Sequence, residues 1–416
     1  DKFRHIVEKH LVPLFSGAIL LDDFEESSSS QKTVSWRDPC SFYIKPRKDA
    51  DYRCVLTRTQ EFAKTASGGV TEHKVVVAFI EALQEIAESI GSLAEQDLLS
   101  HLARRVAVKA ICQRANHEPM VLATIDQFDT WSTRLYEGQP ITAAVGFSSS
   151  PRPPGVSLGD IWEKDFSPVL TNGFDTLLSS DFEGRIKGYR SLKIPEPEEL
   201  PLYAPHRLSL IAFWTAQHPA RIAIVLNRTG EILVIQNGRL VFTRRGGVWH
   251  FLTHEPVITQ MRCPQDKDVR KAVYASCLDA SFARTGACIG IMTSGDVHRL
   301  GKVAPEKGDH IQTGISVKSR LINKIVRGKA FQYLDRRLRQ ELLAIDGATI
   351  LDYQGKLLAV GAILHIDGGS SGGGRLAAAI ELGKYGTGIK VSQDGGIRGY
   401  YRCKDQETAR PAFVVM

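Results

Sequence analysis

Residues 346–395 read DGATILDYQGKLLAVGAILHIDGGSSGGGRLAAAIELGKYGTGIKVSQDG, and this stretch decides the expected fold. Its apolar runs at 348–351, 356–364 and 388–392 have the length of buried strands. Residues 375–382, which lie before the third run, are predicted to form a helix. Strands that alternate with helices are typical of layered α/β domains, so the stretch predicts the α/β class. Upstream, the pattern continues with expected helices at 269–283 and 321–343 and a strand at 287–292.

A glycine-rich loop connects the strand at 356–364 to the helix at 375–382. It runs from Asp367 to Arg375 and has glycine at five positions between them. Glycine lets backbone N–H groups approach an anion closely, and the following helix adds the positive end of its dipole. Arg375 contributes a forked donor suited to phosphate. The pattern indicates a phosphate-binding loop; the alternative is a flexible linker, because glycine and serine runs are common in linkers.

Asp346 stands directly before Gly347 at the start of a predicted strand. An aspartate at such a junction is commonly a turn or cap residue. Its carboxylate would also suit a divalent metal ion and could help to deprotonate a sugar hydroxyl. The residues alone leave both interpretations open.

The chain before residue 260 has other patterns. Asn237-Gly238 lies between two strand-like runs, which predicts a tight hairpin. A break rich in serine and proline lies at 148–155, after the helical patterns, and strand patterns begin after Pro201. We therefore predict three regions: a helical or α+β region at 1–150, a β-rich region at 156–260 and an α/β domain at 265–416. The expected helices of the front part are 73–90 and 97–112, and its expected strands are 221–226, 231–236 and 239–244.

The composition is that of a globular protein. Of 416 residues, 43% are hydrophobic and 24% are charged, which excludes disorder, collagen and coiled coil as descriptions of the whole chain. The formal net charge of +7 suits anionic partners such as nucleotides, but it is dispersed, so we do not expect nucleic-acid binding. The seven cysteines form no CxxC pair, which argues against a zinc cluster and favours the reducing cytoplasm. No apolar run approaches the ~20 residues that span a bilayer, so we expect no membrane segment.

Three motifs of the C-terminal region resemble the diadenylate cyclase domain, which condenses two ATP molecules into cyclic di-AMP. Asp346-Gly347-Ala348 matches the Asp-Gly-Ala motif of that family. GGRLAAA at 373–379 stands where the family has Gly-Thr-Arg-His-Arg-Ala-Ala, and VSQDGG at 391–396 where it has Val-Ser-Glu-Glu-Thr-Gly. Upstream, LDASFARTGACIGI at 278–291 looks like the helix and strand that precede these motifs. The resemblance covers about residues 265–405.

The resemblance implies a mixed sheet flanked by helices, with a nucleotide site at these motifs. It implies that Asp346 and Arg375 are catalytic, that Asp346 and Asp394 bind Mg²⁺ or Mn²⁺, and that ATP is the substrate. The residues that it implies in nucleotide binding are Gly286, Ala287, Gly347, Ala348, Ser370, Ser371, Gly372, Gly373, Gly374, Arg375 and Ser392.

The sequence departs from the family in two of the motifs. Gly374 replaces the threonine, and Leu376 and Ala377 replace the histidine and the second arginine of Arg-His-Arg. Gln393-Asp394 replaces the Glu-Glu pair. Two functions therefore stay open: a cyclase that releases pyrophosphate, and a catalytically inactive regulator that binds ATP or a cyclic nucleotide. Because two domains of the family meet face to face, the resemblance implies a homo-oligomer. Residues 1–260 resemble, in architecture, sensor-like regions fused to such domains in some bacterial proteins, and the sequence does not identify their signal or partner.

Overall fold

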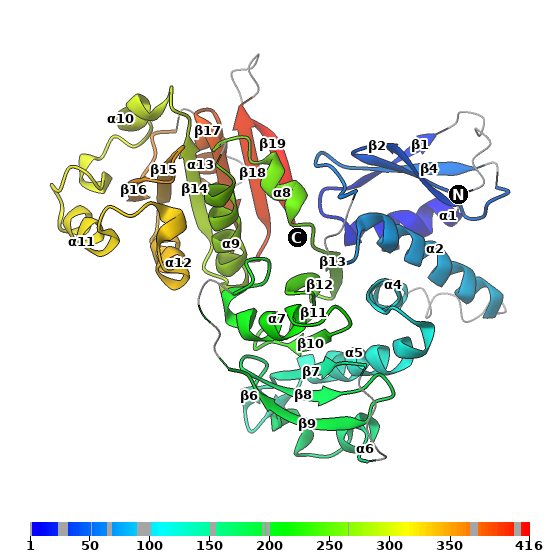
Figure 1. Ribbon diagram of the computed structural model, residues 1–416. Coiled ribbons are helices and arrows are strands. Elements are labelled where there is room, and N and C mark those ends of the chain that lie inside the picture. Colours follow the sequence, from blue (N-terminus) through cyan, green and yellow to red (C-terminus); the bar gives the residue numbers. More distant parts are fainter. Residues whose placement is uncertain are drawn as a thin grey trace. The chain divides into compact units, whose positions relative to one another are not determined.

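The computed structural model describes residues 2–23, 32–50, 52–64, 69–89, 101–149, 155–193, 196, 200–264, 266–366, 373–402 and 409–416. The chain forms two compact units, Asp1–Thr253 and His254–Met416. Both units combine helices with sheets, so the fold class is mixed α/β, as predicted (Figure 1). Within the described residues, no helix is long and apolar enough to cross a membrane.

The N-terminal unit contains a four-stranded sheet in the order β1-β4-β3-β2 and a seven-stranded sheet in the order β13-β12-β11-β10-β7-β8-β9. The strands of the smaller sheet are β1 (Ile19–Asp23), β2 (Val34–Asp38), β3 (Ser41–Ile44) and β4 (Arg53–Thr57). Those of the larger sheet are β7 (Ala143–Phe147), β8 (Thr176–Ser180), β9 (Ile186–Ser191), β10 (Ile222–Leu226), β11 (Ile232–Gln236), β12 (Arg239–Arg245) and β13 (Val248–Phe251). A small hairpin pairs β5 (Leu135–Tyr136) with β6 (Gln139–Pro140).

The larger sheet groups the residues differently from the three predicted regions. Strand β7 belongs to the predicted region 1–150, yet it pairs with β8 and β10 of the predicted region 156–260. The whole of Asp1–Thr253 is one compact unit, so residue 150 lies inside a unit. The sequence break at 148–155 lies in the stretch of chain between β7 and β8, two neighbouring strands of the same sheet.

Both faces of the larger sheet are covered by helices, and this explains the apolar runs of its central strands. Helices α5 and α7 both pack against β10 and β11, and every residue of these two strands is buried. A strand buried on both faces needs no alternation of polar residues. The helices of this unit are α1 (Lys2–Ile6), α2 (Glu72–Ser89), α4 (Leu102–Ile111), α5 (Glu118–Ser132), α6 (Leu158–Trp162) and α7 (Ser209–Ala216).

The predicted hairpin is confirmed. Strands β11 and β12 pair antiparallel, with Gln236 opposite Arg239. Asn237 and Gly238 between them have φ values of +51° and +73°. Positive φ at both central residues is the geometry of the tight turn that Asn-Gly favours.

The C-terminal unit is built on a six-stranded sheet in the order β16-β15-β14-β17-β18-β19. Strands β14 and β15 are parallel and all other pairs are antiparallel, so the sheet is mixed. The strands are β14 (Ala287–Met292), β15 (Ala348–Asp352), β16 (Leu357–Ala362), β17 (Gly386–Val391), β18 (Ile397–Arg402) and β19 (Ala409–Val415). The helices are α8 (Glu255–Gln260), α9 (Lys267–Ala283), α10 (Leu300–Val303), α11 (Val317–Val326), α12 (Arg336–Ala344) and α13 (Gly374–Gly383).

Helix α13 lies close to the sheet because small residues face each other across the contact. A Cβ atom on Gly388 of β17 would lie 1.9 Å from the carbonyl oxygen of Ala379, and one on Gly290 of β14 would lie 2.6 Å from Leu382. At Gly388 a larger residue would require a shift of the α13 backbone, and at Gly290 it would require the Leu382 side chain to move. This packing holds the middle and the C-terminal half of α13 against β14 and β17.

The prediction of one helix over 321–343 is wrong, because this segment contains the end of α11 and most of α12. Arg327 caps α11 in the left-handed conformation, with φ +51°, and Gly328 follows with φ +71°. A glycine with positive φ after a left-handed cap is a common way to end a helix. A short 3₁₀ helix at Phe331–Tyr333 then leads to α12.

Candidate functional site

Three chain segments that carry the predicted site residues meet at one end of the C-terminal sheet. Gly286 precedes β14, Gly347 precedes β15 and Ser392 follows β17. Because β14 runs parallel to β15 and antiparallel to β17, with Cys288 opposite Ala348 and Ala287 opposite Val391, all three positions lie at the same edge. The topology therefore brings together three segments, of which the first and the last are more than 100 residues apart in the sequence.

The side chain of Arg375 lies over Gly286. A Cβ atom on Gly286 would lie 2.7 Å from Arg375 Nη1 and 3.4 Å from Gln393 Cγ. Gly286 also has φ +67°, a conformation that side chains other than glycine rarely adopt. Arg375 comes from the first turn of α13, so the helix start, the end of β17 and the start of β14 contribute to one site.

Asp346 lies opposite this arginine. Its Oδ1 atom is 4.0 Å from Arg375 Nη2, and the two side chains are 96% and 37% exposed. A long and exposed ion pair contributes little to stability, so either group can exchange its partner for a ligand at small cost. Arg375 and Asp346 together offer one cation and one anion at an open surface.

The backbone around Asp346 is held by a glycine contact. Gly347 has φ +102°, and a Cβ atom there would lie 2.5 Å from the carbonyl carbon of Gly361. Gly361 has φ +59° at a bulge of β16, and its carbonyl oxygen accepts a hydrogen bond of 3.1 Å from Lys318 Nζ. Lys318 also forms an ion pair with the buried carboxylate of Asp309. Two glycines and this pair therefore fix the turn that presents Asp346.

The turn after β17 is held from α9. Ser281 Oγ donates a hydrogen bond of 2.6 Å to the carbonyl oxygen of Gly395, and Arg284 Nη1 donates to that of Asp394. Ser392 N donates to Gly396 O at 2.8 Å, which closes the turn. The Asp394 side chain is exposed, and its Oδ1 accepts from Gly396 N at 3.3 Å.

Gly373 and Gly374, the described part of the glycine-rich loop, are exposed. Gly373 caps α13 with φ +84°, and a Cβ atom on Gly373 or Gly374 would meet nothing within 4 Å. Residues 367–372, which include the predicted ligands Ser370, Ser371 and Gly372, lie outside the described residues. The first turn of α13 lies beside Arg375, and a helix N-terminus of this kind is suited to an anion.

The other predicted residues have distinct environments. Ala287 and Ala348 are buried in β14 and β15, so a ligand could meet only their backbone. Among the described residues, no group of three or more His, Cys, Asp or Glu side chains could hold a metal ion. Lys384, which follows α13, donates to Glu381 at 2.6 Å.

Cys288 is the thiol next to the site on β14. It is buried, and burial raises its pKa to about 12, although Arg375 acts in the opposite direction. A thiol with such a pKa stays protonated at neutral pH and is a poor nucleophile. Cys288 therefore belongs to the core beneath the site.

Sequence reasoning missed four residues that build the site. Gln393 packs beside Gly286 and Arg375, Arg284 holds the turn after β17, and Lys318 with Asp309 supports the Asp346 turn. Arg284 could have been identified from the sequence, because it stands directly before Thr285-Gly286 at the end of a predicted helix. Lys318 and Asp309 could not have been identified from a local sequence pattern, because Gly361, which they support, is more than 40 residues away.

Comparisons with known proteins do not assign this chain to a family. No family model matches the chain, and no curated protein matches it. A search of solved structures matches a double mutant of DacA from Staphylococcus aureus with 18% identity. The match covers 35% of this chain and 87% of the DacA chain, with a TM-score of 0.25. A TM-score this low carries no argument about activity.

Proposed function

We propose that the C-terminal unit is a nucleotidyltransferase domain that condenses two ATP molecules into cyclic di-AMP and releases pyrophosphate. The observation that carries the proposal is the meeting of the three motif segments: Arg375 lies over Gly286 and 4.0 Å from Asp346, next to the turn that follows Ser392. Residues that resemble a family in sequence order alone have no reason to converge in space unless they serve one site.

The arrangement suits the binding of a triphosphate. The guanidinium of Arg375 would contact phosphate oxygens in a forked geometry, and the first turn of α13 would add backbone N–H donors. Attack of a ribose 3′-hydroxyl on an α-phosphate needs neutralised charge and in-line placement. Arg375 and the helix start supply fixed positive charge where the leaving pyrophosphate would develop its negative charge.

The exposed carboxylate of Asp346 fits a divalent cation that arrives with the nucleotide. Mg²⁺ commonly takes one or two carboxylates from the protein and the remaining ligands from phosphate oxygens and water. Asp346 would hold Mg²⁺ or Mn²⁺, and Asp394 is the second candidate carboxylate. When bound, the cation would screen phosphate charge and lower the pKa of the attacking hydroxyl.

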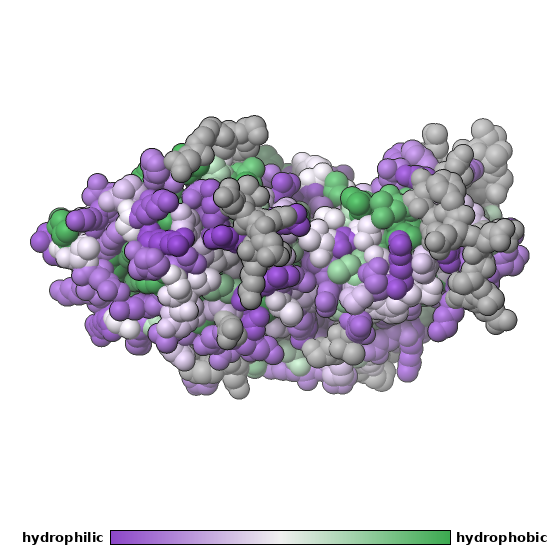
Figure 2. All heavy atoms as spheres, turned by 90° about the horizontal axis from the view of Figure 1, so that it is seen from above, coloured by the Kyte–Doolittle hydropathy of each residue, from purple (hydrophilic) through white to green (hydrophobic). Residues whose placement is uncertain are grey.

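Condensation of two ATP molecules requires two sites that face each other. Apolar side chains next to Asp346 support such an oligomer: Ile345 and Ile363 are exposed, as are Val317 and Leu321 on α11. In Figure 2, apolar atoms reach the surface among hydrophilic ones at the end of the C-terminal unit that carries α11. If these groups form a contiguous apolar patch, that patch would suit a contact with a second copy of the chain.

A second function, an inactive nucleotide-binding regulator, is favoured by one observation. Of the three basic family positions only Arg375 is basic, and Ala377 is buried against the sheet. In this reading the N-terminal unit and the cyclase-like unit would both serve sensing, and no pyrophosphate would form.

One experiment separates the two functions. The full chain is incubated with each of the four ribonucleoside triphosphates and Mg²⁺ or Mn²⁺, and the products are read by mass spectrometry. Cyclic di-AMP from ATP supports the cyclase. If calorimetry finds ATP bound while no triphosphate yields a cyclic dinucleotide, the regulator is correct. If no triphosphate binds, both functions are wrong.

A further inference from the structure

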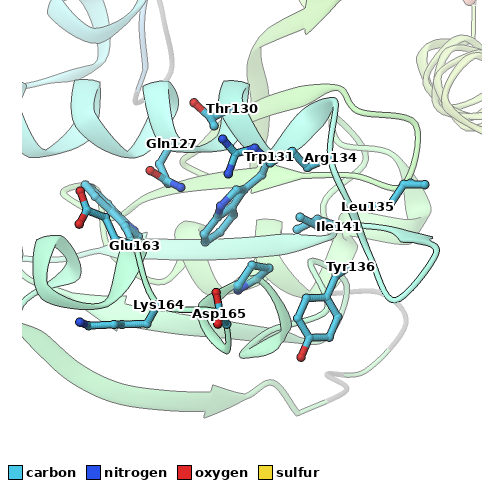
Figure 3. A pocket seen from close by; sticks show the side chains of 12 residues that line it. Gln127, Thr130, Trp131, Arg134, Leu135, Tyr136, Ile141, Glu163, Lys164 and Asp165 are labelled. Atoms are coloured by element: carbon cyan, nitrogen blue, oxygen red, sulfur yellow. The ribbon is translucent and has the colours of Figure 1, made fainter.

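We infer that the N-terminal unit carries a binding site for an uncharged planar heteroaromatic molecule of nucleoside size. The site is a cavity of about 510 Å³ between α5, the β5–β6 hairpin and the segment after α6 (Figure 3). Ligand pockets in proteins span ~300–1,000 Å³, so this volume suits a small molecule. The cavity lies entirely within one unit and is separate from the nucleotide site proposed above.

Aromatic side chains form much of the wall of this cavity. Trp131 comes from the last turns of α5, Tyr136 from the β5–β6 hairpin and Trp162 from the end of α6. In Figure 3 the Trp131 ring projects into the cavity between Gln127 and Ile141. Flat aromatic surfaces bind planar rings by stacking, and each stacked nucleobase contributes substantially to affinity.

Packing and an ion pair hold Trp131 and the adjacent end of α5 in place. Trp131 is buried and stacks on Phe128 with ring centroids 5.6 Å apart. Asp129 on the same helix forms an ion pair of 2.6 Å with Arg244 of β12, which anchors this end of α5 to the sheet. A pocket with a fixed aromatic wall loses little entropy when it binds a ligand.

The polar groups of the cavity carry no net charge. Arg134 and Lys164 are balanced by Glu163 and Asp165. Among the described residues, none of these four side chains has an ion pair or hydrogen bond to another residue. The rim therefore gives no net attraction to a phosphate, whereas carboxylates and cations together can bind hydroxyl groups.

Gln127 supplies the polar contact suited to a ring edge. Its amide offers both a hydrogen-bond donor and an acceptor, and neither forms a hydrogen bond with another described residue. A heteroaromatic ring presents the complementary pair along one edge. The combination of stacking walls, one amide and a neutral rim favours a nucleoside over a nucleotide and over a purely apolar ligand.

The test is a titration of the full chain with adenosine, guanosine, cytidine and uridine, followed by calorimetry and tryptophan fluorescence. We expect one nucleoside or more to bind at one site per chain, with Trp162→Ala and Gln127→Ala each weakening binding about tenfold or more. The matched control is Trp36→Ala, which removes another half-buried tryptophan of this unit outside the cavity. Gln127→Ala keeps the test valid if Trp162→Ala does not fold.

Three results would overturn the inference. The first is that no nucleoside binds at millimolar concentration. The second is that the 5′-monophosphates bind and the nucleosides do not, which would show a charged ligand. The third is that Arg375→Ala abolishes nucleoside binding while Trp162→Ala leaves it intact, which would assign the binding to the C-terminal unit. Failure of ATP cyclisation leaves these outcomes unchanged, so the two proposals are tested separately.

Discussion

Gly286 and Arg375 depend on each other, because the guanidinium occupies the space that a side chain at position 286 would fill. We predict that Gly286→Ala displaces Arg375, since the new Cβ would lie 2.7 Å from its Nη1 atom. The left-handed φ of +67° adds a strain of about 1 kcal/mol. Calorimetry should show ATP affinity reduced about tenfold or more, as expected when a charge-assisted contact is lost.

The matched control for this variant is Gly301→Ala in α10. A Cβ atom at Gly301 meets nothing within 4 Å, and its φ is not in the left-handed region. Both variants add one methyl group to the C-terminal unit, but only Gly286→Ala touches Arg375. Equal ATP affinity of the two variants would contradict the placement of Arg375 in the site.

Individual residues of the site differ in how far the sequence could predict them. Asp346, Gly347 and Arg375 stand in motifs with recognisable order and spacing. Lys318 could not be predicted, because it supports the Asp346 turn only through Gly361 at a bulge of β16. Sequence patterns report local geometry, whereas this support depends on how three distant segments pack.

At the scale of elements, α9 and α12 are joined by a buried ion pair. Arg336 donates from Nε and Nη2 to both carboxylate oxygens of Asp279, at 2.7 and 2.8 Å, and both side chains are buried. Removal of one partner leaves a buried charge without compensation, so we predict that Asp279→Asn lowers the free energy of unfolding by about 3–5 kcal/mol. Urea unfolding followed by circular dichroism would measure it.

Asp268→Asn on the same helix is the control. Asp268 pairs with Lys271 at 3.4 Å, and its side chain is 71% exposed. An exposed pair of this kind contributes about 0–1 kcal/mol. A similar loss of stability in both variants would show that the Asp279–Arg336 pair does not join the two helices.

Helices and strands could be predicted from the sequence where a short-range pattern determines them. The apolar runs of β14, β15 and β17 and the Asn-Gly hairpin follow from short-range signals, and all are confirmed. The separation of α11 from α12 was missed, because a single Gly328 inside a helical pattern is usually tolerated. In this chain Arg327 takes the left-handed conformation before it, and tertiary packing decides that conformation.

At the scale of the whole molecule, the N-terminal unit should lose stability in mild acid. Burial lowers the pKa of His10, His73, His117 and His250 from 6.5, and for His117 this burial includes a stack on Phe182 at 3.9 Å. When the folded pKa lies below the unfolded one, the unfolded state binds more protons as the pH falls through about 6.5. The free energy of unfolding therefore decreases from about pH 7.5 to about pH 6.

Tryptophan fluorescence isolates this effect, because all five tryptophans lie before Thr253. Urea titrations at several pH values thus report on the N-terminal unit alone. His117→Gln should reduce the pH dependence, since one of the titrating groups is removed. A free energy of unfolding that is constant or rises over this pH range would contradict the prediction.

The compact units of the structure group the residues differently from the three regions predicted from the sequence. Composition placed a boundary at 148–155, but β7, which precedes it, pairs with β8 and β10, which follow it, within one compact unit. Strand pairing over long separations leaves no local signature. The predicted boundary near residue 260 lies close to the division between the two units after Thr253. At this point the sequence pattern changes from β hairpins to alternating strands and helices.

The central claim is that the C-terminal unit forms cyclic di-AMP at the site that contains Asp346. The most direct test incubates the wild-type chain and Asp346→Asn with ATP and Mg²⁺ or Mn²⁺ and measures cyclic di-AMP and pyrophosphate by mass spectrometry. The account predicts both products from the wild type and a loss of about a hundredfold or more in the variant, which keeps its melting temperature because Asp346 is 96% exposed. A folded wild-type chain that binds ATP but forms neither product, or an Asp346→Asn variant with full activity, would contradict it.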